Sequence, residues 1–189
     1  MPVGEPIPLN EEHSHHHAQN DELEKEYGKL SLVFFGIFAV TIVIFLAVDG
    51  HGPYQHMTQF QGFLAQLMGV FFIVFAGFKL VNLQSFAHGF AMYDLIAKKS
   101  MFYAKLYPFI QLMIGIGMFI IPDKVAVHIA ALIVSAIAII GVINSLMNKH
   151  KIHCACLGNV IKMPLATVSA IEDGSMLVIS AYMVIAMLL

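Results

Sequence analysis

The sequence is short of charge and contains no arginine. Only 12% of its 189 residues are charged, about half the fraction of roughly 25% that soluble domains carry. All ten cationic residues are lysines, which argues against two-pronged clamps on phosphate or carboxylate groups, because the planar guanidinium group of arginine makes these best. The net charge is −2, so the chain has no excess of positive charge that would attract nucleic acid, and we expect no nucleic-acid partner.

Cysteine is also scarce, with two residues in the whole chain. Two cysteines cannot build a disulfide scaffold. The sequence also lacks a nucleophile elbow, a phosphate-binding loop and a recognisable catalytic triad, so a conventional hydrolase or transferase is not expected. If the protein catalyses a reaction, its residues favour thiol–disulfide exchange.

Long apolar runs indicate a protein of the lipid bilayer. Hydrophobic residues make up 59% of the chain. Runs of membrane-spanning length predict five helices, at about residues 30–48, 62–82, 103–121, 125–147 and 164–189. The residues before the first run are polar and acidic, unlike a cleavable signal peptide, so we interpret that run as an uncleaved helix. The predicted fold class is an all-α integral membrane protein.

Several residues predict local features of these helices. Phe86, Phe90, Tyr93 and Ile96 recur at helical spacing within the less apolar residues 84–100, which predicts a short helix in the membrane interface.

The third and fourth spans carry further signals. We expect Pro108 in the first turn of the third span, where proline is tolerated. Gly115 and Gly117 are expected to let neighbouring helices approach closely. His128, near one end of the fourth span, is interpreted as a solvated interfacial histidine.

Polar side chains also fall in or beside the predicted spans: Lys79, Asp94, Gln111, Glu172 and Asp173. Charged groups at membrane depth are costly unless they face the helix bundle and find a partner. Lys79 is interpreted as extending its long stem to the membrane interface, with an ion pair as the alternative. Either the last helix begins as an interfacial segment, or Glu172 and Asp173 face the bundle, where Lys79 would be their partner.

The lysines predict the orientation in the membrane. Lys124 alone lies on one side, and the other nine lie on the opposite side: Lys25, Lys29, Lys79, Lys98, Lys99, Lys105, Lys149, Lys151 and Lys162. Loops rich in lysine and arginine stay in the cytoplasm. We therefore predict a multi-pass protein of the inner (cytoplasmic) membrane whose N-terminus and residues 148–163 are cytoplasmic and whose C-terminus is outside.

Cys154 and Cys156 lie one residue apart within residues 148–163, between the last two spans. Cationic neighbours favour the reactive thiolate, so we prefer a redox pair that exchanges a disulfide with a partner protein. The alternative is a soft metal such as Cu, Zn or Hg, which thiolates bind well. His150 and His153 would then complete a set of two nitrogens and two sulfurs, as in structural zinc sites. A structural role is the third alternative.

Residues 1–29 form a polar tail with four clustered histidines: His13, His15, His16 and His17. Neutral imidazole groups suit transition metals, so the tail could take a metal ion from a donor protein. A solvated tail without a metal is the alternative. No other cofactor is expected.

From the second span onward, over roughly residues 62–189, the chain resembles the MauE/DoxX family of redox-associated membrane proteins. The matching stretches are residues 75–80, 90–97 and 107–112, followed by Cys154-Ala155-Cys156-Leu157-Gly158 before the last helix. The cysteine motif is the specific part. The resemblance implies a DoxX-like four-helix transmembrane bundle, here preceded by one extra helix at 30–48.

The resemblance also implies a function. The namesake branch is associated with methylamine utilisation, where it is needed for maturation of the disulfide-rich small subunit of methylamine dehydrogenase. A related branch carries an N-terminal heavy-metal-associated domain where this chain has its histidine-rich tail. The resemblance therefore implies a thiol-redox factor that assists a partner, with a heavy-metal binding or transport protein as the alternative.

Three departures from the family pattern bear on that function. The extra helix reverses the predicted side of the cysteines, toward a cytoplasm that keeps thiols reduced. Gln111 stands where many relatives carry Glu, which bears on any proton role there. The chain contains no thioredoxin-like domain, so a redox partner would be a separate protein.

Overall fold

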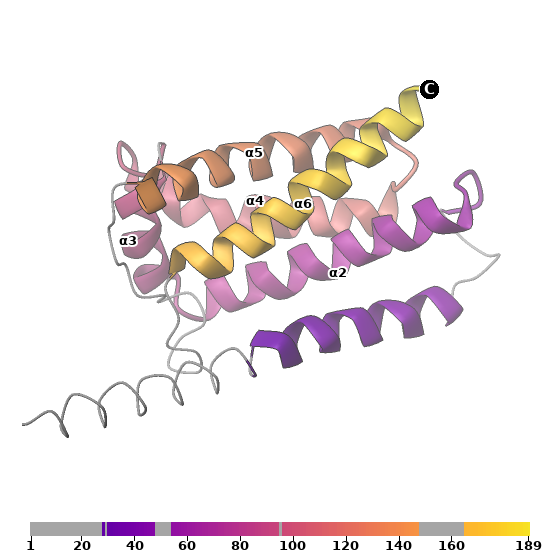
Figure 1. Cartoon of the computed structure of the whole chain (residues 1–189), viewed down its shortest axis with the longest axis horizontal. Coiled ribbons are helices and arrows are strands. Elements are labelled where there is room, and N and C mark those ends of the chain that lie inside the picture. Colours follow the sequence, from indigo (N-terminus) through magenta and orange to yellow (C-terminus); the bar gives the residue numbers. More distant parts are fainter. Residues whose placement is uncertain (1–27, 29, 48–53, 95, 148–164) are drawn as a thin grey trace, which may run out of the picture.

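The computed structural model describes residues 28, 30–47, 54–94, 96–147 and 165–189, and every regular element within them is a helix. Five helices are long and apolar enough to cross a membrane, which confirms the predicted number of spans. They are Leu30–Ala47, α2 (Gln59–Val81), α4 (Met101–Ile120), α5 (Val125–Met147) and α6 (Leu165–Leu188), and the shorter α3 (Leu83–Tyr93) lies between α2 and α4 in the chain (Figure 1).

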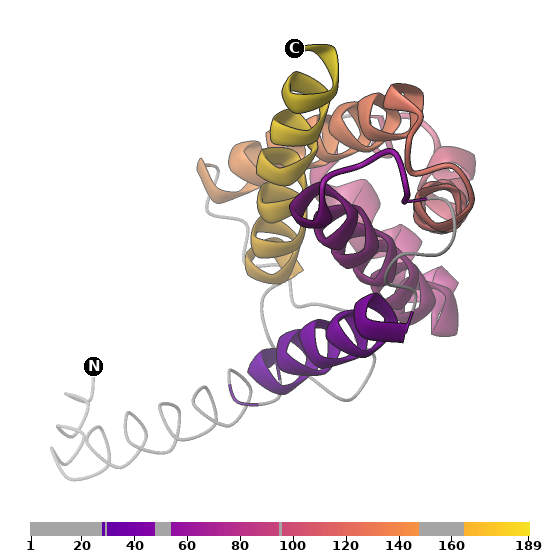
Figure 2. The same ribbon diagram turned by 90° about the vertical axis from the view of Figure 1, so that its right-hand side faces the viewer.

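The helices α2, α4, α5 and α6 form a four-helix bundle in which α5 packs along α6 and α2 packs along α4. The first helix lies beside α2 at the edge of this bundle (Figures 1 and 2). Its contacts are largely aromatic: the ring of Phe34 lies 5.3 Å from that of Phe71, and Phe38 lies 5.8 Å from Phe63. Leu32 on its other side is 74% exposed, as expected for a lipid-facing residue.

The close packing of α2 and α4 depends on two glycines. A Cβ atom at Gly115 would lie 3.1 Å from the carbonyl oxygen of Gly69 and 2.9 Å from Cγ1 of Ile73. Both distances are shorter than ordinary contacts, so the two backbones touch at a point where no side chain fits. A Cβ at Gly117 would meet nothing closer than Val127 at 3.5 Å. The predicted close approach is therefore found at Gly115 and not at Gly117.

Polar caps set where two of the helices begin. Thr58 and Gln61 form a reciprocal capping box: the Gln61 N–H donates to Thr58 Oγ1 at 3.2 Å, and the Thr58 N–H donates to Gln61 Oε1 at 3.1 Å. The helix α2 consequently begins at Gln59, three residues before the predicted start. Ser100 caps α4 in a similar way, accepting from the Tyr103 N–H at 3.3 Å.

Two residues differ from their sequence-based expectations. Pro108 lies about two turns inside α4 rather than in its first turn, because the Ser100 cap starts the helix at Met101. His128 is fully buried rather than solvated, with its Nε2 atom 3.0 Å from the carbonyl oxygen of Pro122. The turn between α4 and α5 supplies this hydrogen-bond partner, so the imidazole can be buried.

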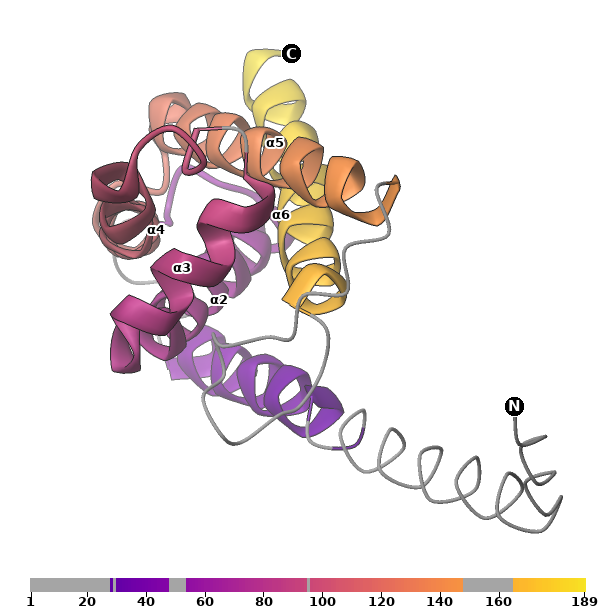
Figure 3. The same cartoon turned by 90° about the vertical axis from the view of Figure 1, so that its left-hand side faces the viewer.

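The helix α3 crosses one end of the bundle (Figure 3), which we call the α3 end. The end of α2 and the start of α4 adjoin it, and the C-terminus lies at the opposite end (Figure 1). Phe86 and Phe90 of α3 are buried, and the Phe90 ring lies 4.5 Å from that of Tyr107 in α4. The predicted interfacial helix is therefore packed onto the bundle, and it ends at Tyr93 rather than near residue 100.

Candidate functional site

Charged and polar side chains from three helices meet inside the bundle near the α3 end. They form what we call the buried cluster, and each is at most 3% exposed: Lys79 from α2, Tyr107 and Gln111 from α4, and Glu172 and Asp173 from α6. The Lys79 Nζ atom donates to Glu172 Oε1 at 2.6 Å and to Gln111 Oε1 at 2.7 Å. A buried ion pair thus links α2 to α6.

The ion pair corrects the interpretation of Lys79 as a side chain that extends to the membrane interface. Lys79 lies only two residues before the end of α2, about 3 Å along the helix axis, so its stem could have reached the interface. The side chain is instead buried, because Glu172 offers an opposite charge and Gln111 an acceptor inside the bundle. The structure therefore contains the alternative, an ion pair between Lys79 and the last helix.

Hydrogen bonds extend the buried cluster from the ion pair to Asp173. Gln111 Nε2 donates to Glu172 Oε1 at 3.0 Å and lies 3.4 Å from the Tyr107 hydroxyl oxygen. The Tyr107 hydroxyl in turn donates to Asp173 Oδ1 at 3.4 Å. The contacts around Glu172 are therefore short, and those around Asp173 are long.

Tyr107 is the member of the buried cluster that sequence reasoning missed. It lies four residues before Gln111, so the two side chains share one face of α4. That spacing was the available signal, because a tyrosine facing a polar residue inside a span usually has a hydrogen-bond partner for its hydroxyl group.

Aromatic rings enclose the buried ammonium group. The Lys79 Nζ atom lies 5.3 Å from the ring centre of Tyr107 and 5.8 Å from that of Phe86. The negative faces of aromatic rings attract a cation at such distances. Because Phe86 belongs to α3, this helix helps to separate the ion pair from the water at the α3 end.

Asp94 lies at the end of α3 and is fully buried. Its Oδ1 atom accepts from the Ile96 N–H at 2.9 Å and from the Ala97 N–H at 2.8 Å. Its Oδ2 atom has no hydrogen-bond partner among the described residues. Burial raises the pKa of Asp94, and the two backbone N–H groups offset part of this rise. Asp94 is close enough to Asp173 for the two groups to interact electrostatically.

The remaining predicted site residues lie outside the part of the chain that the structure describes. They are the cysteine pair with its neighbouring histidines and the histidines of the tail: Cys154, Cys156, His150, His153, His13, His15, His16 and His17. Among the residues that are described, no three His, Cys, Asp or Glu side chains come together in a group that could hold a metal ion.

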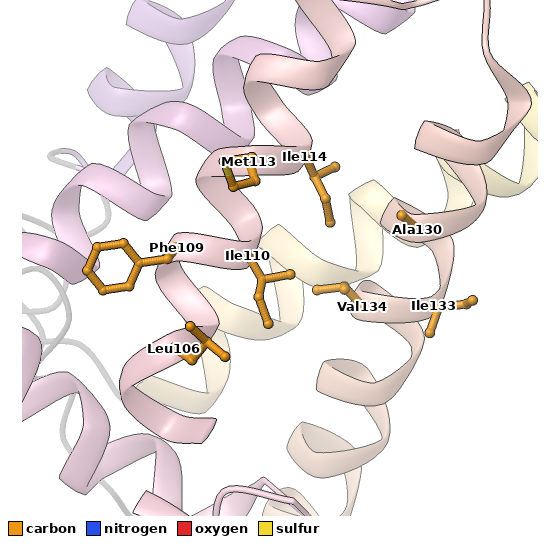
Figure 4. A pocket seen from close by; sticks show the side chains of 8 residues that line it. All are labelled: Leu106, Phe109, Ile110, Met113, Ile114, Ala130, Ile133 and Val134. Atoms are coloured by element: carbon orange, nitrogen blue, oxygen red, sulfur yellow. The ribbon is translucent and has the colours of Figure 1, made fainter. Parts of the chain in front are cut away.

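An apolar groove lies between α4 and α5 (Figure 4). Leu106, Ile110 and Ile133 are among its lining residues, and its volume is about 470 Å³. No polar side chain lines it, so the groove offers a surface for hydrocarbon and no group for chemistry.

Comparison with known proteins places most of the chain in a single family model. The model described as methylamine utilisation protein MauE matches residues 55–188, which extend from the residues before α2 to the end of α6. The first helix precedes the matched region. No curated protein and no solved structure matches the chain.

Proposed function

The chain belongs to the MauE family, and from this premise we propose that it is a membrane thiol-redox factor that assists the maturation of a partner protein. Cys154 and Cys156 are the exchanging pair. The basic residues that precede them, Lys149 and Lys151, favour thiolate over thiol and therefore favour attack on a disulfide.

The observation that carries this proposal is the position of the buried cluster relative to the chain that bears the cysteines. Residues 148–164 join the end of α5 to the start of α6. Glu172 follows the start of α6 by seven residues, about 10 Å along the helix axis. The cysteine pair therefore precedes, in one continuous stretch of chain, the helix that contributes both buried carboxyl groups. Buried ionisable groups in a membrane bundle mark functional sites more often than structural ones.

The chemistry is a balanced exchange of two thiols for one disulfide. A thiolate of the partner attacks the Cys154–Cys156 disulfide, which gives a mixed disulfide and one free thiolate on this chain. The partner's second thiolate then attacks the mixed disulfide and releases the other cysteine. Two electrons and two protons pass from the partner to the pair, and the reverse sequence reduces a partner disulfide.

We further propose that the protein resides in the cytoplasmic membrane, with the cysteines facing the cytoplasm. Lys79 is buried and does not count as a loop lysine, yet seven of the nine other lysines still precede the first helix or lie in the connections on the cysteine side. An eighth, Lys105, lies near the start of α4 at the same end. In a reducing cytoplasm the exchange would reduce the partner. On the opposite side of the membrane it would oxidise the partner.

Thiol trapping tests the exchange. We expect one of the variants Cys154→Ser and Cys156→Ser to accumulate a mixed disulfide with the partner in cell membranes, because the attacking thiol lacks its resolving neighbour. The adduct should disappear on treatment with a reductant and be absent from the double Ser variant. If both cysteines of the natural chain stay reduced under oxidant and no adduct forms in either variant, the proposal is wrong.

The same protein preparations test the heavy-metal alternative. Purified protein is loaded with Cu, Zn or Hg, washed, and subjected to elemental analysis. Metal that is retained by the natural chain and lost from the double Ser variant would favour metal binding or delivery over redox exchange. A chain that retains no metal while forming the mixed disulfide would favour the redox factor.

A further inference from the structure

The buried cluster contains more acid than base. Lys79 is its one cationic side chain, and Glu172 and Asp173 are its two carboxyl groups. Asp94, also fully buried and close enough to interact with Asp173, adds a third carboxyl group nearby. If all of these groups were ionised, the bundle would hold uncompensated negative charge in a medium of low dielectric constant, at a cost of several kcal/mol per ion.

We propose that Glu172 and Asp173 together bind one exchangeable proton, with Lys79 as the counter-charge of the carboxylate that remains. One proton makes the charges of these three side chains sum to zero. A neutral carboxylic acid is the usual state of a buried carboxyl group that has no cation of its own.

The geometry assigns the proton to Asp173. Glu172 Oε1 receives a hydrogen bond from Lys79 at 2.6 Å and another from Gln111 at 3.0 Å, and such donors stabilise a carboxylate. Asp173 Oδ1 receives its hydrogen bond from the Tyr107 hydroxyl, at 3.4 Å. This long contact gives a carboxylate less compensation than the two shorter ones at Glu172, whereas it suits a neutral acid.

The charge around Asp173 comes from several helices. The titratable or charged groups at this end of the bundle include Lys79 on α2, His88 on α3, Asp94 at its end, Lys98 in the following turn, Tyr103 and Tyr107 on α4, and Glu172 on α6. The titratable residue within the described part of α5 is His128, which lies at the other end of the bundle beside Pro122. His88 is exposed and contacts Gln84, so within the part of the chain that the structure describes Lys79 is the cation that contacts the pair.

Asp94 supports the same inference independently. It is fully buried, and its Oδ2 atom has no hydrogen-bond partner among the described residues. Its charge, where present, would repel a second negative charge on Asp173 and so favour the proton there. The inference does not depend on the proposed thiol exchange, because none of its residues is a cysteine.

Infrared spectroscopy of the purified protein in detergent tests the proposal. A protonated carboxylic acid has a C=O stretching band that a carboxylate lacks, and an exchangeable one shifts in D₂O. At neutral pH we expect the natural chain to show this band. The variants Glu172→Gln and Asp173→Asn should each lose it, because the one remaining carboxyl group then pairs with Lys79. The variant Lys79→Met should show about twice the band, since neither carboxylate then has a cation.

Controls separate the alternatives. Asp94→Asn is the matched control: it removes the neighbouring carboxyl group but leaves two carboxyl groups beside the one Lys79, so most of the band of the pair should remain. The double Ser variant of Cys154 and Cys156 should also keep the band, so failure of the redox proposal and failure of this one are distinguishable. The proposal is overturned if the natural chain lacks the band at neutral pH, or if only Asp94→Asn removes it. It is also overturned if the band appears only after Na⁺ and K⁺ are replaced by choline, which would indicate a metal-cation site. The natural chain alone suffices for the first and third outcomes if a variant does not fold.

Discussion

Lys79 offers a strong test of how the bundle tolerates buried charge. Glu172 and Asp173 follow one another in α6, so if either carboxyl group is replaced the other can still supply the carboxylate that compensates Lys79. We therefore expect Glu172→Gln and Asp173→Asn each to lower the free energy of unfolding by only about 1 kcal/mol, the scale of one lost hydrogen bond. The double variant should behave very differently, because the buried ammonium group then has no carboxylate beside it.

The size of the loss follows from the geometry. At the 2.6 Å separation of Lys79 Nζ and Glu172 Oε1, the attraction is about 6 kcal/mol at an effective dielectric constant of about 20. Desolvation of the two ions offsets most of it while both are present. Removal of the acids leaves only the desolvation cost of Lys79, so we expect a loss of about 3–5 kcal/mol. For a chain of this size that corresponds to a fall in Tm on the order of 10 °C.

The triple variant with Lys79→Met is the decisive control. It removes the orphaned ammonium group along with the acids, and methionine suits an apolar interior, so it should regain most of the stability that the double variant lost. Unfolding is followed by circular dichroism in one detergent for all variants. If the two single losses simply add up in the double variant, and the triple variant is no more stable than the double, then Lys79 does not depend on the two acids as argued.

Three further predictions concern packing and pH. Gly115→Ala should lower the free energy of unfolding by about 1–3 kcal/mol relative to Gly77→Ala. A Cβ at Gly115 meets the α2 backbone, whereas one at Gly77 meets nothing within 4 Å. Equal Tm values for the two variants would refute this. Burial raises the pKa of Asp94 above its ordinary value of 3.8, so the folded state keeps this proton to a higher pH than the unfolded state does. The free energy of unfolding should therefore fall as the pH rises from about 3.8 through the raised pKa, and Asp94→Asn should remove this dependence. Asp123 should have the opposite effect on the pH dependence of stability. Its hydrogen bond with Lys124 lowers its pKa, so its contribution to stability is lost as the pH falls. If Asp123→Asn changed the dependence of Tm on pH in the same direction as Asp94→Asn, this assignment would be wrong.

Features that depend on the length of apolar runs, and on polar residues within those runs, were predictable from the sequence. The five spans follow from apolar run length, and Gln111, Glu172 and Asp173 stood out because polar groups at membrane depth require partners. Lys79 was harder to interpret. A lysine near the end of a span can reach the interface or turn toward the bundle. The position of α6, whose Glu172 follows Lys79 by 93 residues in the chain, decides between these outcomes.

Burial at helix ends was the least predictable feature. His128 and Phe86 both lie near the ends of helices, where sequence patterns suggest contact with water or lipid headgroups. The α4–α5 turn covers the first and the bundle covers the second. Such covering depends on how connections fold back over the bundle, and local periodicity carries no information about that.

By itself the sequence determined that this chain crosses a membrane five times, that its two cysteines precede the last helix, and that a few charged groups must be sheltered within the bundle. These properties depend on apolar run length and residue chemistry, which are local. Only the tertiary structure decided that Lys79 pairs with Glu172, that Tyr107 joins them, and that Tyr107 donates the hydrogen bond to Asp173. Those relations join α2, α4 and α6 across the bundle, and they exist because close helix packing, made possible by glycines such as Gly115, brings distant residues together in a medium where charge must be compensated.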